Sequence, residues 1–278
     1  MRLLLCDTAT PWTSVAVVDG GCAAGAAVVD GGCAAGAAVV DGPGTWHRRQ
    51  FGATGHVEAC AQLIREVLSD AAVPPGGLDA IVCGVGPGPF TGLRVGVVTA
   101  VMMGQSLGIP VLGLCSHDIL AAGVLAGGHP RPDGLPPLCI VTDARRREVY
   151  WAEYSGWTRV AGPSIAPLTP ATEITGPMDV RHAVSWLRHH AAATGQEWGP
   201  ALLATWARDV TTGRAPQLGA PDSAGGSVPA GLLPPRPLYL RRPHVAEPGS
   251  APGPAPAPAP GAAPEAEPGA APSVPRHR

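Results

Sequence analysis

The sequence predicts an α/β fold, from three stretches that follow one another along the chain. An apolar run at 80–83 is typical of a short buried strand, and a loop rich in glycine and proline, Gly84–Gly96, follows it directly. From Leu93 to Leu107 the chain carries almost no charge, which indicates a helix with little polar surface. Strand, tight loop and helix in this order form the repeating unit of α/β proteins.

The remaining elements extend this pattern on both sides. Strands are predicted at 3–6 and 14–18, around a turn at Asp7–Pro11. A helix is predicted at 56–72, because its apolar residues recur every three or four positions. Further strands are predicted at 109–114, 138–142 and 148–154, and a further helix near 180–193.

Composition bounds the class of protein. The 278 residues are 45% apolar, which is enough for a sizeable core. With a net charge of -2 and 14% charged residues, the chain has no broad basic surface to hold a nucleic acid or a membrane by itself. The seven cysteines lack zinc or Cys-x-x-Cys spacing and are expected to be buried and reduced. The sequence shows no signal peptide and no apolar run of membrane-spanning length, which predicts a cytoplasmic protein.

The loop Gly84–Gly96 resembles a phosphate-binding loop but lacks the required residues. A Walker A loop needs a lysine, and all 19 basic residues are arginine. A dinucleotide fingerprint needs glycine at position 89 or 91, where the chain has Pro89 and Thr91. The loop is therefore predicted to let a strand turn sharply into a close-packed helix. The residues assigned to this structural loop are Gly84, Gly86, Pro87, Gly88 and Arg94.

A perfect tandem repeat interrupts the first part of the chain. Residues 17–27 recur unchanged at 28–38, and a third copy begins at Val39. Natural repeat units are longer, and an odd unit of this length would reverse the buried face of any strand it extended. We therefore expect the insert at 17–38 to include one copy extruded as a hairpin loop.

Two later stretches carry little fold information. Residues 171–230 show weak periodicity apart from the helix near 180–193. Residues 243–278 are rich in proline, alanine and glycine and cannot bury a core, so a disordered tail is expected there.

Six motifs, in order along the chain, carry a resemblance to a known family. They are Leu4–Thr10, His56–Glu58, Gly84–Gly96, Gly108–Gly113, Asp143–Tyr150 and Pro237–Arg241. With these motifs the chain resembles the TsaB (YeaZ) family, which takes part in tRNA threonylcarbamoyladenosine biosynthesis. The resemblance implies a two-lobed actin-like, Hsp70-like (ribonuclease H-like) fold, with lobes at 1–115 and 116–242. Whether the second lobe is complete is left open by the weak pattern at 171–230.

The resemblance also implies a role. TsaB is the non-catalytic partner and activator of the TsaD transferase, which forms N6-threonylcarbamoyladenosine next to the anticodon of tRNAs reading codons that begin with A. The expected partners are therefore a TsaD-type transferase, in a heterodimer, and a TsaE-type ATPase, with tRNA reached only indirectly. No catalytic residue is expected, and a homodimer of the chain alone is left open.

The resemblance places the partner interface on the helices at 56–72 and 91–107. The second of these helices is apolar or small nearly all round, so packing on its own sheet leaves a second apolar face. Its small residues would allow close approach of a partner helix, and its methionines would give an adaptable contact. The predicted interface residues are Val57, Ala61, Ile64, Leu68, Gly92, Val95, Gly96, Thr99, Met102 and Met103.

No metal or cofactor of the chain's own is predicted. The His-x-x-x-His metal pair of TsaD corresponds here to Ser116 and Leu120, which are not metal ligands of that kind. His117, which lies between them, is expected to be a capping or surface residue. His56 and Cys60 share a helix face but are expected to pack rather than to bind metal.

Two rival functions remain open. An actin-like ATPase or small-molecule kinase would use Asp7, with Thr8 and Thr10, as its nucleotide turn, but the matching second-lobe turn 142–147 has no glycine. In the leading interpretation the chain has no cofactor of its own, and whether ATP binds at the joint surface of a complex is left open. A peptidase acting on its paralogue would need an activated nucleophile, and no serine or cysteine has an evident histidine and carboxylate partner in the sequence.

Overall fold

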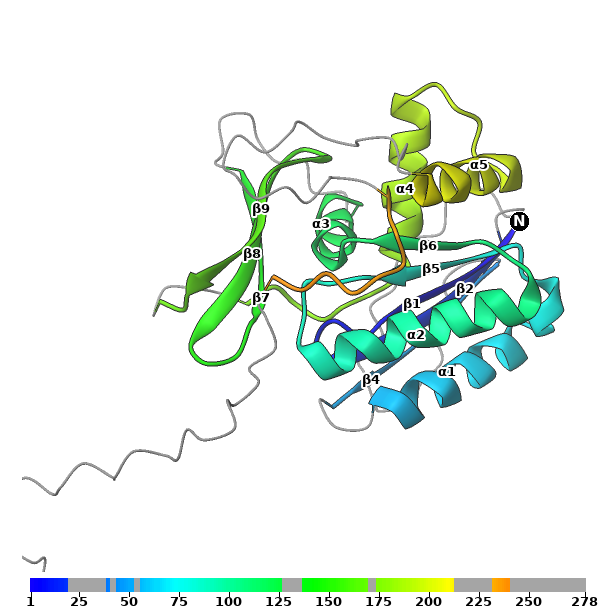
Figure 1. The fold of residues 1–278 in the computed structure, drawn as a ribbon, viewed down its shortest axis with the longest axis horizontal. Helices are drawn as coiled ribbons and strands as arrows, with labels where there is room; N and C mark the ends of the chain where they lie inside the picture. The colour runs from blue at the N-terminus through cyan, green and yellow to red at the C-terminus, as the bar shows by residue number, and fades with distance from the viewer. Residues whose placement is uncertain are drawn as a thin grey trace, which may run out of the picture. The chain divides into compact units, whose positions relative to one another are not determined.

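A mixed seven-stranded sheet organises the first half of the chain (Figure 1). The structure is a computed structural model that describes residues 1–19, 39–40, 44–52, 56–126, 137–169, 174–212 and 232–240, without the side chains of 39, 40, 57 and 211. Its first three long strands, β1 (Arg2–Asp7), β2 (Trp12–Asp19) and β4 (Thr45–Phe51), form an antiparallel meander. Strands β5 (Ala80–Gly84) and β6 (Val111–Leu114) then add parallel to β1. The carboxyl ends of β1, β5 and β6 therefore meet at one edge of the sheet.

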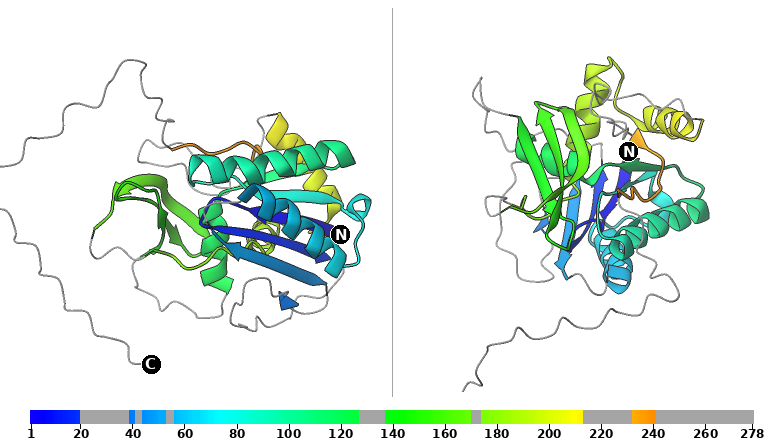
Figure 2. Two further views of the ribbon diagram at one scale, coloured as in Figure 1. Left: turned by 90° about the horizontal axis from the view of Figure 1, so that it is seen from below. Right: turned by 60° about the vertical axis from the view of Figure 1, so that its left-hand side comes forward.

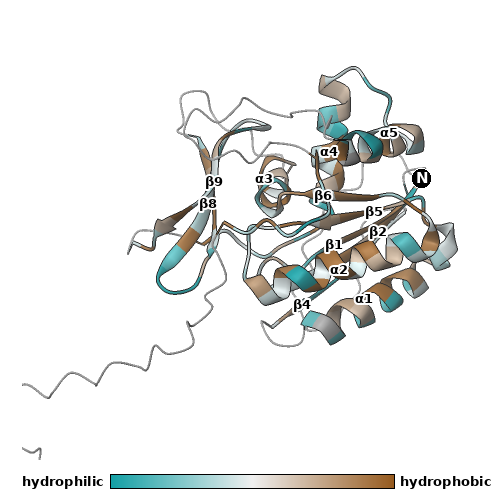
Figure 3. Ribbon diagram, viewed as in Figure 1, coloured by the Kyte–Doolittle hydropathy of each residue, from teal (hydrophilic) through white to brown (hydrophobic). Residues whose placement is uncertain are grey.

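Alternate residues of the central strands pack into two separate hydrophobic cores, one on each face of the sheet. On β1, Leu4 and Cys6 face the helices α1 (His56–Asp70) and α2 (Phe90–Leu107). Leu3 and Leu5 face the other side, as the two-residue period of a strand requires. Figure 2 shows α1 and α2 together on one face, and Figure 3 shows the central strands as largely hydrophobic. The sequence prediction of an α/β fold is thus confirmed.

The opposite face of the sheet is covered by the second half of the chain. Its helices are α3 (Ser116–Ala126), α4 (His182–Ala193) and α5 (Pro200–Thr211). A separate antiparallel sheet has the order β7 (Leu138–Asp143), β8 (Glu148–Ser155) and β9 (Thr158–Pro167). Because Ile140, Ala152 and Tyr154 of this sheet join the same core as Leu3 and Leu5, α3 is packed between the two sheets.

The chain returns to the first sheet near its end. Strand β10 (Leu232–Leu233) pairs antiparallel with β6, and the backbone N–H of Leu238 donates to the carbonyl of Val85 at 2.7 Å. The division into lobes at residue 115 stays a prediction, and the expected tail at 243–278 lies outside the described residues. No helix within the described ranges is long and apolar enough to cross a membrane.

The tandem repeat begins in β2 and contributes strand β3 (Val39–Val40) at the edge of the sheet opposite β10. Strands β2 and β4 pair directly, and the N–H of Asp19 donates to the carbonyl of Gly44 at 2.6 Å. The first copy of the repeat thus begins inside β2. The start of the third copy forms β3, which pairs with the other side of β4. Residues 20–38 lie outside the described residues, so the extruded hairpin stays a prediction.

Most predicted elements are confirmed with small shifts of their ends, but several elements were missed. Helix α3 was missed because its residues 116–122 are all buried, so it has no polar face to reveal a helical period. Strand β4 was missed because it is largely polar, and β9 and α5 were also missed. The short 3-10 helix η1 (Pro75–Gly77) forms at the predicted end of α1.

Candidate functional site

The turn after β1 is the first candidate site, and its carboxylate is enclosed. Asp7 is fully buried. One of its oxygens accepts a hydrogen bond from the Ser116 hydroxyl at 2.6 Å, and the other accepts from the N–H of Ala9 at 2.7 Å. The N–H of Gly86 in turn donates to the Ser116 hydroxyl at 3.1 Å. Both carboxylate oxygens are therefore engaged inside the chain, and burial raises the pKa of Asp7 to about 6.

Four glycines spaced by four residues enclose this turn. A Cβ on Gly84 would lie 2.5 Å from the carboxyl carbon of Asp7, and one on Gly88 would lie 2.8 Å from the carbonyl carbon of Ala9. A Cβ on Gly92 would lie 2.9 Å from the carbonyl oxygen of Thr8, and one on Gly96 would lie 2.5 Å from its hydroxyl. The glycines thus let the loop and the first turns of α2 close around the residues that follow β1.

Thr8 ties this turn to α2. Its hydroxyl donates to the carbonyl of Gly92 at 2.7 Å and accepts from the N–H of Gly96 at 3.0 Å. This contact corrects the expectation that Gly92 and Gly96 admit a partner helix, because the space above them is filled by Thr8. Thr10 is also buried and accepts from the N–H of Trp12 at 3.2 Å. Neither Asp7, Thr8 nor Thr10 presents an open nucleotide-binding face in this structure.

The matching turn of the second sheet is also engaged. The Thr142 hydroxyl lies 2.9 Å from Nε2 of His117, and both residues are buried. His117 is therefore an interior residue, which corrects its predicted capping or surface position. Burial, helped by the nearby charge of Arg159, lowers the pKa of His117 to about 3. The imidazole is neutral at physiological pH, and its contact with Thr142 joins α3 to the second sheet.

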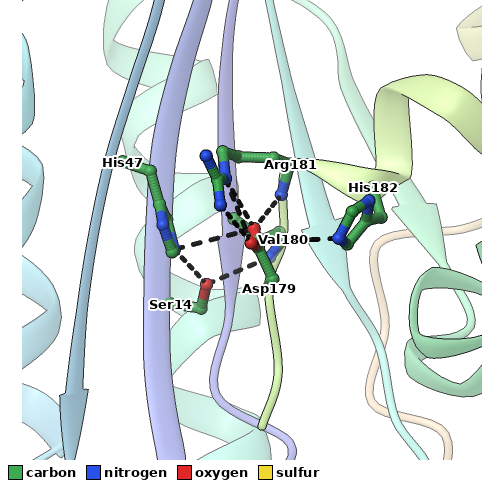
Figure 4. A network of polar contacts seen from close by, with 6 residues as sticks. All are labelled: Ser14, His47, Asp179, Val180, Arg181 and His182. Carbon is green, nitrogen blue, oxygen red and sulfur yellow. Dashed lines mark hydrogen bonds and ion pairs between the residues drawn. The ribbon is translucent and has the colours of Figure 1, made fainter. Parts of the chain in front are cut away.

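A buried polar network forms the second candidate site (Figure 4). The hydroxyl of Ser14 lies 3.0 Å from Nε2 of His47 and accepts the N–H of Val180 at 3.0 Å. The same Nε2 lies 3.8 Å from Asp179, whose carboxylate pairs with Arg181. The network joins β2 and β4 to the segment before α4. Its members are Ser14, His47, Asp179, Val180, Arg181 and His182.

This network contains serine, histidine and aspartate but lacks the geometry of a catalytic triad. In a triad the aspartate binds one imidazole nitrogen while the serine binds the other. Here Ser14 and Asp179 both approach Nε2 of His47, and the carboxylate is already paired with Arg181. Ser14 and His47 are also buried, so no substrate carbonyl can reach the hydroxyl in this conformation. The arrangement serves to hold the two halves of the chain together.

We predict a structural effect for Ser14→Ala. Removing the hydroxyl leaves the N–H of Val180 and the imidazole of His47 buried without this partner, which should lower the free energy of unfolding by about 2 kcal/mol. Urea denaturation measures this loss, with Ser155→Ala as the control because Ser155 is exposed on the second sheet. A loss of peptide hydrolysis in Ser14→Ala, with stability unchanged, would contradict a structural role.

Within the described ranges, the cysteines and the clusters of potential metal-binding side chains offer no further candidate site. Cys6, Cys60, Cys83 and Cys115 are free and buried, and burial raises the pKa of Cys60 to about 11 and that of Cys83 to about 12. Cys139 is exposed, contrary to its predicted burial. No three His, Cys, Asp or Glu side chains gather to hold a metal among the residues described. His56 packs against β2, where Nδ1 lies 2.7 Å from the Thr13 hydroxyl.

The outer face of α2 is the third candidate site. Phe90, Arg94, Val98 and Met102, spaced by four residues, line one side of the helix and are called the α2 ridge here. Val98 is 56% exposed and Met102 is 61% exposed, although both are large apolar residues. At Val98 and Met102 the ridge is therefore an apolar surface that the described chain leaves open.

The predicted interface residues divide into three groups. Ile64 and Leu68, like Gly92 and Gly96, are buried within this chain. The predicted interface is corrected at these four positions, because the residues there are not exposed to a partner. Val95, Thr99 and Met103 are half-buried along the ridge, while Met102 and, on α1, Ala61 are exposed. The side chain of Val57 lies outside the described residues. Val98 was missed by sequence reasoning, although its spacing from Met102 would have identified it.

Arg94 belongs to the ridge rather than to the loop alone. Its guanidinium lies 3.8 Å from the centre of the Phe90 ring and donates to the hydroxyl of Tyr239 at 2.7 Å. The Tyr239 ring lies 4.7 Å from that of Phe90. The segment that follows β10 therefore packs against the start of α2 through Tyr239. This contact could not be predicted from the sequence, because the two segments lie far apart along the chain.

Comparison with known proteins finds partial matches to proteins of tRNA threonylcarbamoyladenosine biosynthesis. Residues 50–174 match the family model described as TsaD: tRNA N6-adenosine threonylcarbamoyltransferase. An uncharacterized protein of Mycobacterium leprae (strain TN) is 46% identical over 134 residues, which are 47% of this chain and 34% of that protein. The tRNA threonylcarbamoyladenosine biosynthesis protein TsaB of Bacillus subtilis (strain 168) is 38% identical over 91 residues, or 33% of this chain and 37% of that protein.

A solved structure shares the fold. YeaZ from Pseudomonas aeruginosa superposes with a TM-score of 0.50 at 20% identity, over 73% of this chain and 97% of that chain. The two-lobed, actin-like α/β fold expected from the sequence is thereby confirmed. The aligned stretches span only about a third of the two curated relatives described above. The curated TsaB relatives and the TsaD-type family model support the assignment of this chain to the TsaB (YeaZ) family.

Proposed function

We propose that this chain is a non-catalytic subunit that binds and activates a TsaD-type transferase in tRNA threonylcarbamoyladenosine biosynthesis. The observation that carries the proposal is the exposure of Val98 and Met102 on the α2 ridge, on a helix whose opposite side packs tightly on the sheet. An apolar patch of this kind on a folded chain is typical of a protein-binding surface. A TsaD-type partner fits because the family to which the chain is assigned acts in the same modification.

The polar groups of the chain support an activating rather than a catalytic role. Asp7 and Ser14, from the two polar candidate sites, are buried and hydrogen-bonded within the chain. In this proposal the transferase supplies the reactive groups and reaches the tRNA, and ATP binds at the joint surface of the complex. A TsaE-type ATPase is the further partner.

A charge placed on the ridge tests the proposal. We expect Val98→Glu to weaken binding to the TsaD-type transferase by at least about tenfold, because docking would bury an unpaired carboxylate in an apolar contact. Isothermal titration of the purified chain with the transferase measures the affinity, and formation of modified adenosine in tRNA measures activation. Met102→Glu should act in the same direction.

Thr158→Glu is the matched control, because it adds the same charge at an exposed position of β9, away from α2. This variant should bind as the wild type does. Equal affinity of wild type, Val98→Glu and Met102→Glu would show that the ridge is not the docking surface.

A further inference from the structure

The turn between β7 and β8 presents three consecutive arginines in an unusual backbone conformation. Arg145, Arg146 and Arg147 have φ values of 63°, 54° and 60°. All three therefore lie in the left-handed region, and no glycine stands among them. Each such residue costs roughly 1 to 2 kcal/mol relative to a right-handed conformation.

Local hydrogen bonds hold this strained turn in place. The N–H of Ala144 donates to the carbonyl of Glu148, and the N–H of Glu148 donates to the carbonyl of Arg145, both at 3.0 Å. The N–H of Arg145 also donates to the carboxylate of Asp143 at 2.7 Å. Strain of this kind persists where the surroundings enforce it, and it gathers at sites that bind or switch. The turn, called the arginine turn here, is therefore a built feature.

The arginine turn offers positive charge and hydrogen-bond donors to solvent. Arg145 lies 3.6 Å from Asp143, so that carboxylate offsets part of its charge. Arg146 and Arg147 are exposed and have no ion pair with any residue in the described part of the chain. Their backbone N–H groups likewise have no acceptor there. Glu148 is half-buried, with one carboxylate oxygen turned inside the protein.

The position of the turn relates it to the proposed docking helix. From β8, which follows the turn, the Tyr150 hydroxyl donates to the carbonyl of Gly88 at 3.5 Å, just before α2 begins. Figure 1 shows the β7–β8 turn toward the same end of the molecule as the N-terminal end of α2. A macromolecule bound to a partner on the α2 ridge could therefore also reach the arginine turn.

We infer that the arginine turn contacts the phosphodiester backbone of RNA, through Arg146 and Arg147 in particular. Guanidinium groups bind phosphate oxygens with paired hydrogen bonds, and the free N–H groups add further donors. Because the net charge of the chain is -2, this contact is weak by itself and is measured at low salt, and in a complex it adds to the RNA binding of a partner. The inference of tRNA as the RNA rests on the proposed function.

Salt dependence of RNA binding tests the inference. The full chain is titrated into fluorescent unmodified tRNA, and wild type is compared with the double variant Arg146→Gln, Arg147→Gln. Two lost phosphate contacts should weaken binding about tenfold at about 200 mM salt, and about sevenfold more than that at about 50 mM, since each contact changes the logarithmic slope by about 0.7. The double variant Arg65→Gln, Arg208→Gln removes the same charge from exposed positions of α1 and α5 and should retain the wild-type slope.

A conservative exchange distinguishes the effect of lost charge from an effect on folding. Arg146→Lys with Arg147→Lys keeps the charges, so it should restore most of the salt dependence. Equal slopes for wild type and the Arg146→Gln, Arg147→Gln variant would overturn the inference, as would the absence of wild-type binding at low salt. Displacement of the tRNA by millimolar phosphate at constant ionic strength would also overturn it, because the turn would then bind a free phosphate group.

Binding to the TsaD-type transferase is measured in parallel to separate this inference from the proposed function. If the arginine variants bind the transferase normally but lose the tRNA effect, both proposals stand. If wild type fails to bind the transferase while the tRNA effect remains, only the proposed function fails. If the arginine variants instead lose the transferase and keep wild-type tRNA binding, the turn is a protein contact and the inference is wrong.

Discussion

Acidification is expected to destabilise this protein through His117. The imidazole is buried and neutral in the folded chain, where its pKa is lowered to about 3, whereas an unfolded histidine titrates near 6.5. Below the pKa of the unfolded state, the unfolded chain binds a proton at His117 and the folded chain does not. The free energy of unfolding therefore falls as the pH falls. The loss attributable to His117 should reach roughly 2 to 3 kcal/mol by about pH 4.5 and about 5 kcal/mol over the whole titration.

Asp7 acts in the opposite direction over part of the same range. Because burial raises its pKa to about 6, the folded state binds a proton before the unfolded state does, and acidification to about pH 4.5 returns about 2 kcal/mol. The total pH profile therefore mixes the two groups. Comparison of wild type with a variant at the same pH isolates the contribution of His117.

Urea denaturation at a series of pH values gives this comparison. His117→Gln should show a flatter decline of unfolding free energy between about pH 6.5 and pH 4.5, because the titrating imidazole is gone. His189→Gln is the control: His189 is exposed on α4, and partial burial lowers its pKa in the same direction, so this variant should flatten the decline less than His117→Gln does. Parallel profiles for wild type and His117→Gln would show that His117 does not carry the acid sensitivity.

Gly88→Ala is expected to lower the free energy of unfolding by about 3 kcal/mol. A Cβ at this position would come within 2.8 Å of the carbonyl carbon and the Cα of Ala9. These are backbone atoms of a turn fixed by Asp7, so no flexible side chain can move aside. The cost is one of overpacking, because the backbone of Gly88 does not require a positive φ.

Gly76→Ala provides the matched control for this measurement. No atom lies within 4 Å of a Cβ at Gly76, so its stability should change by no more than about 0.5 kcal/mol. Thermal or urea unfolding of both variants measures the difference. If Gly88→Ala proves as stable as Gly76→Ala, the close contact of the loop with the turn after β1 is wrong.

The sequence predicted those elements whose burial alternates with exposure or whose length is bounded by glycine and proline. Helix α1 has a polar face, and α2 follows an evident loop, so both were found. Helix α3 gave no such signal, because it is buried between two sheets. The purpose of the loop glycines was also only partly predictable, since the atoms they approach belong to Thr8 and Ala9, far back along the chain.

The polar network was beyond sequence reasoning for a similar reason. Ser14, His47 and Asp179 come from three separate segments, and no spacing rule links them. The arginine turn was visible as a run of charge and as a turn without glycine, but its left-handed backbone was not. Long-range geometry, rather than local propensity, decides both features.

The pairing of β10 with β6 has a consequence for biosynthesis on the ribosome. Strand β6 is a buried strand of the first sheet, yet its neighbour on one side comes from residues 232–233. During translation the first sheet must therefore wait on the order of ten seconds with the edge of β6 uncovered. A nascent chain halted before β10 would present an unpaired apolar edge, which is a surface that chaperones bind and that promotes aggregation.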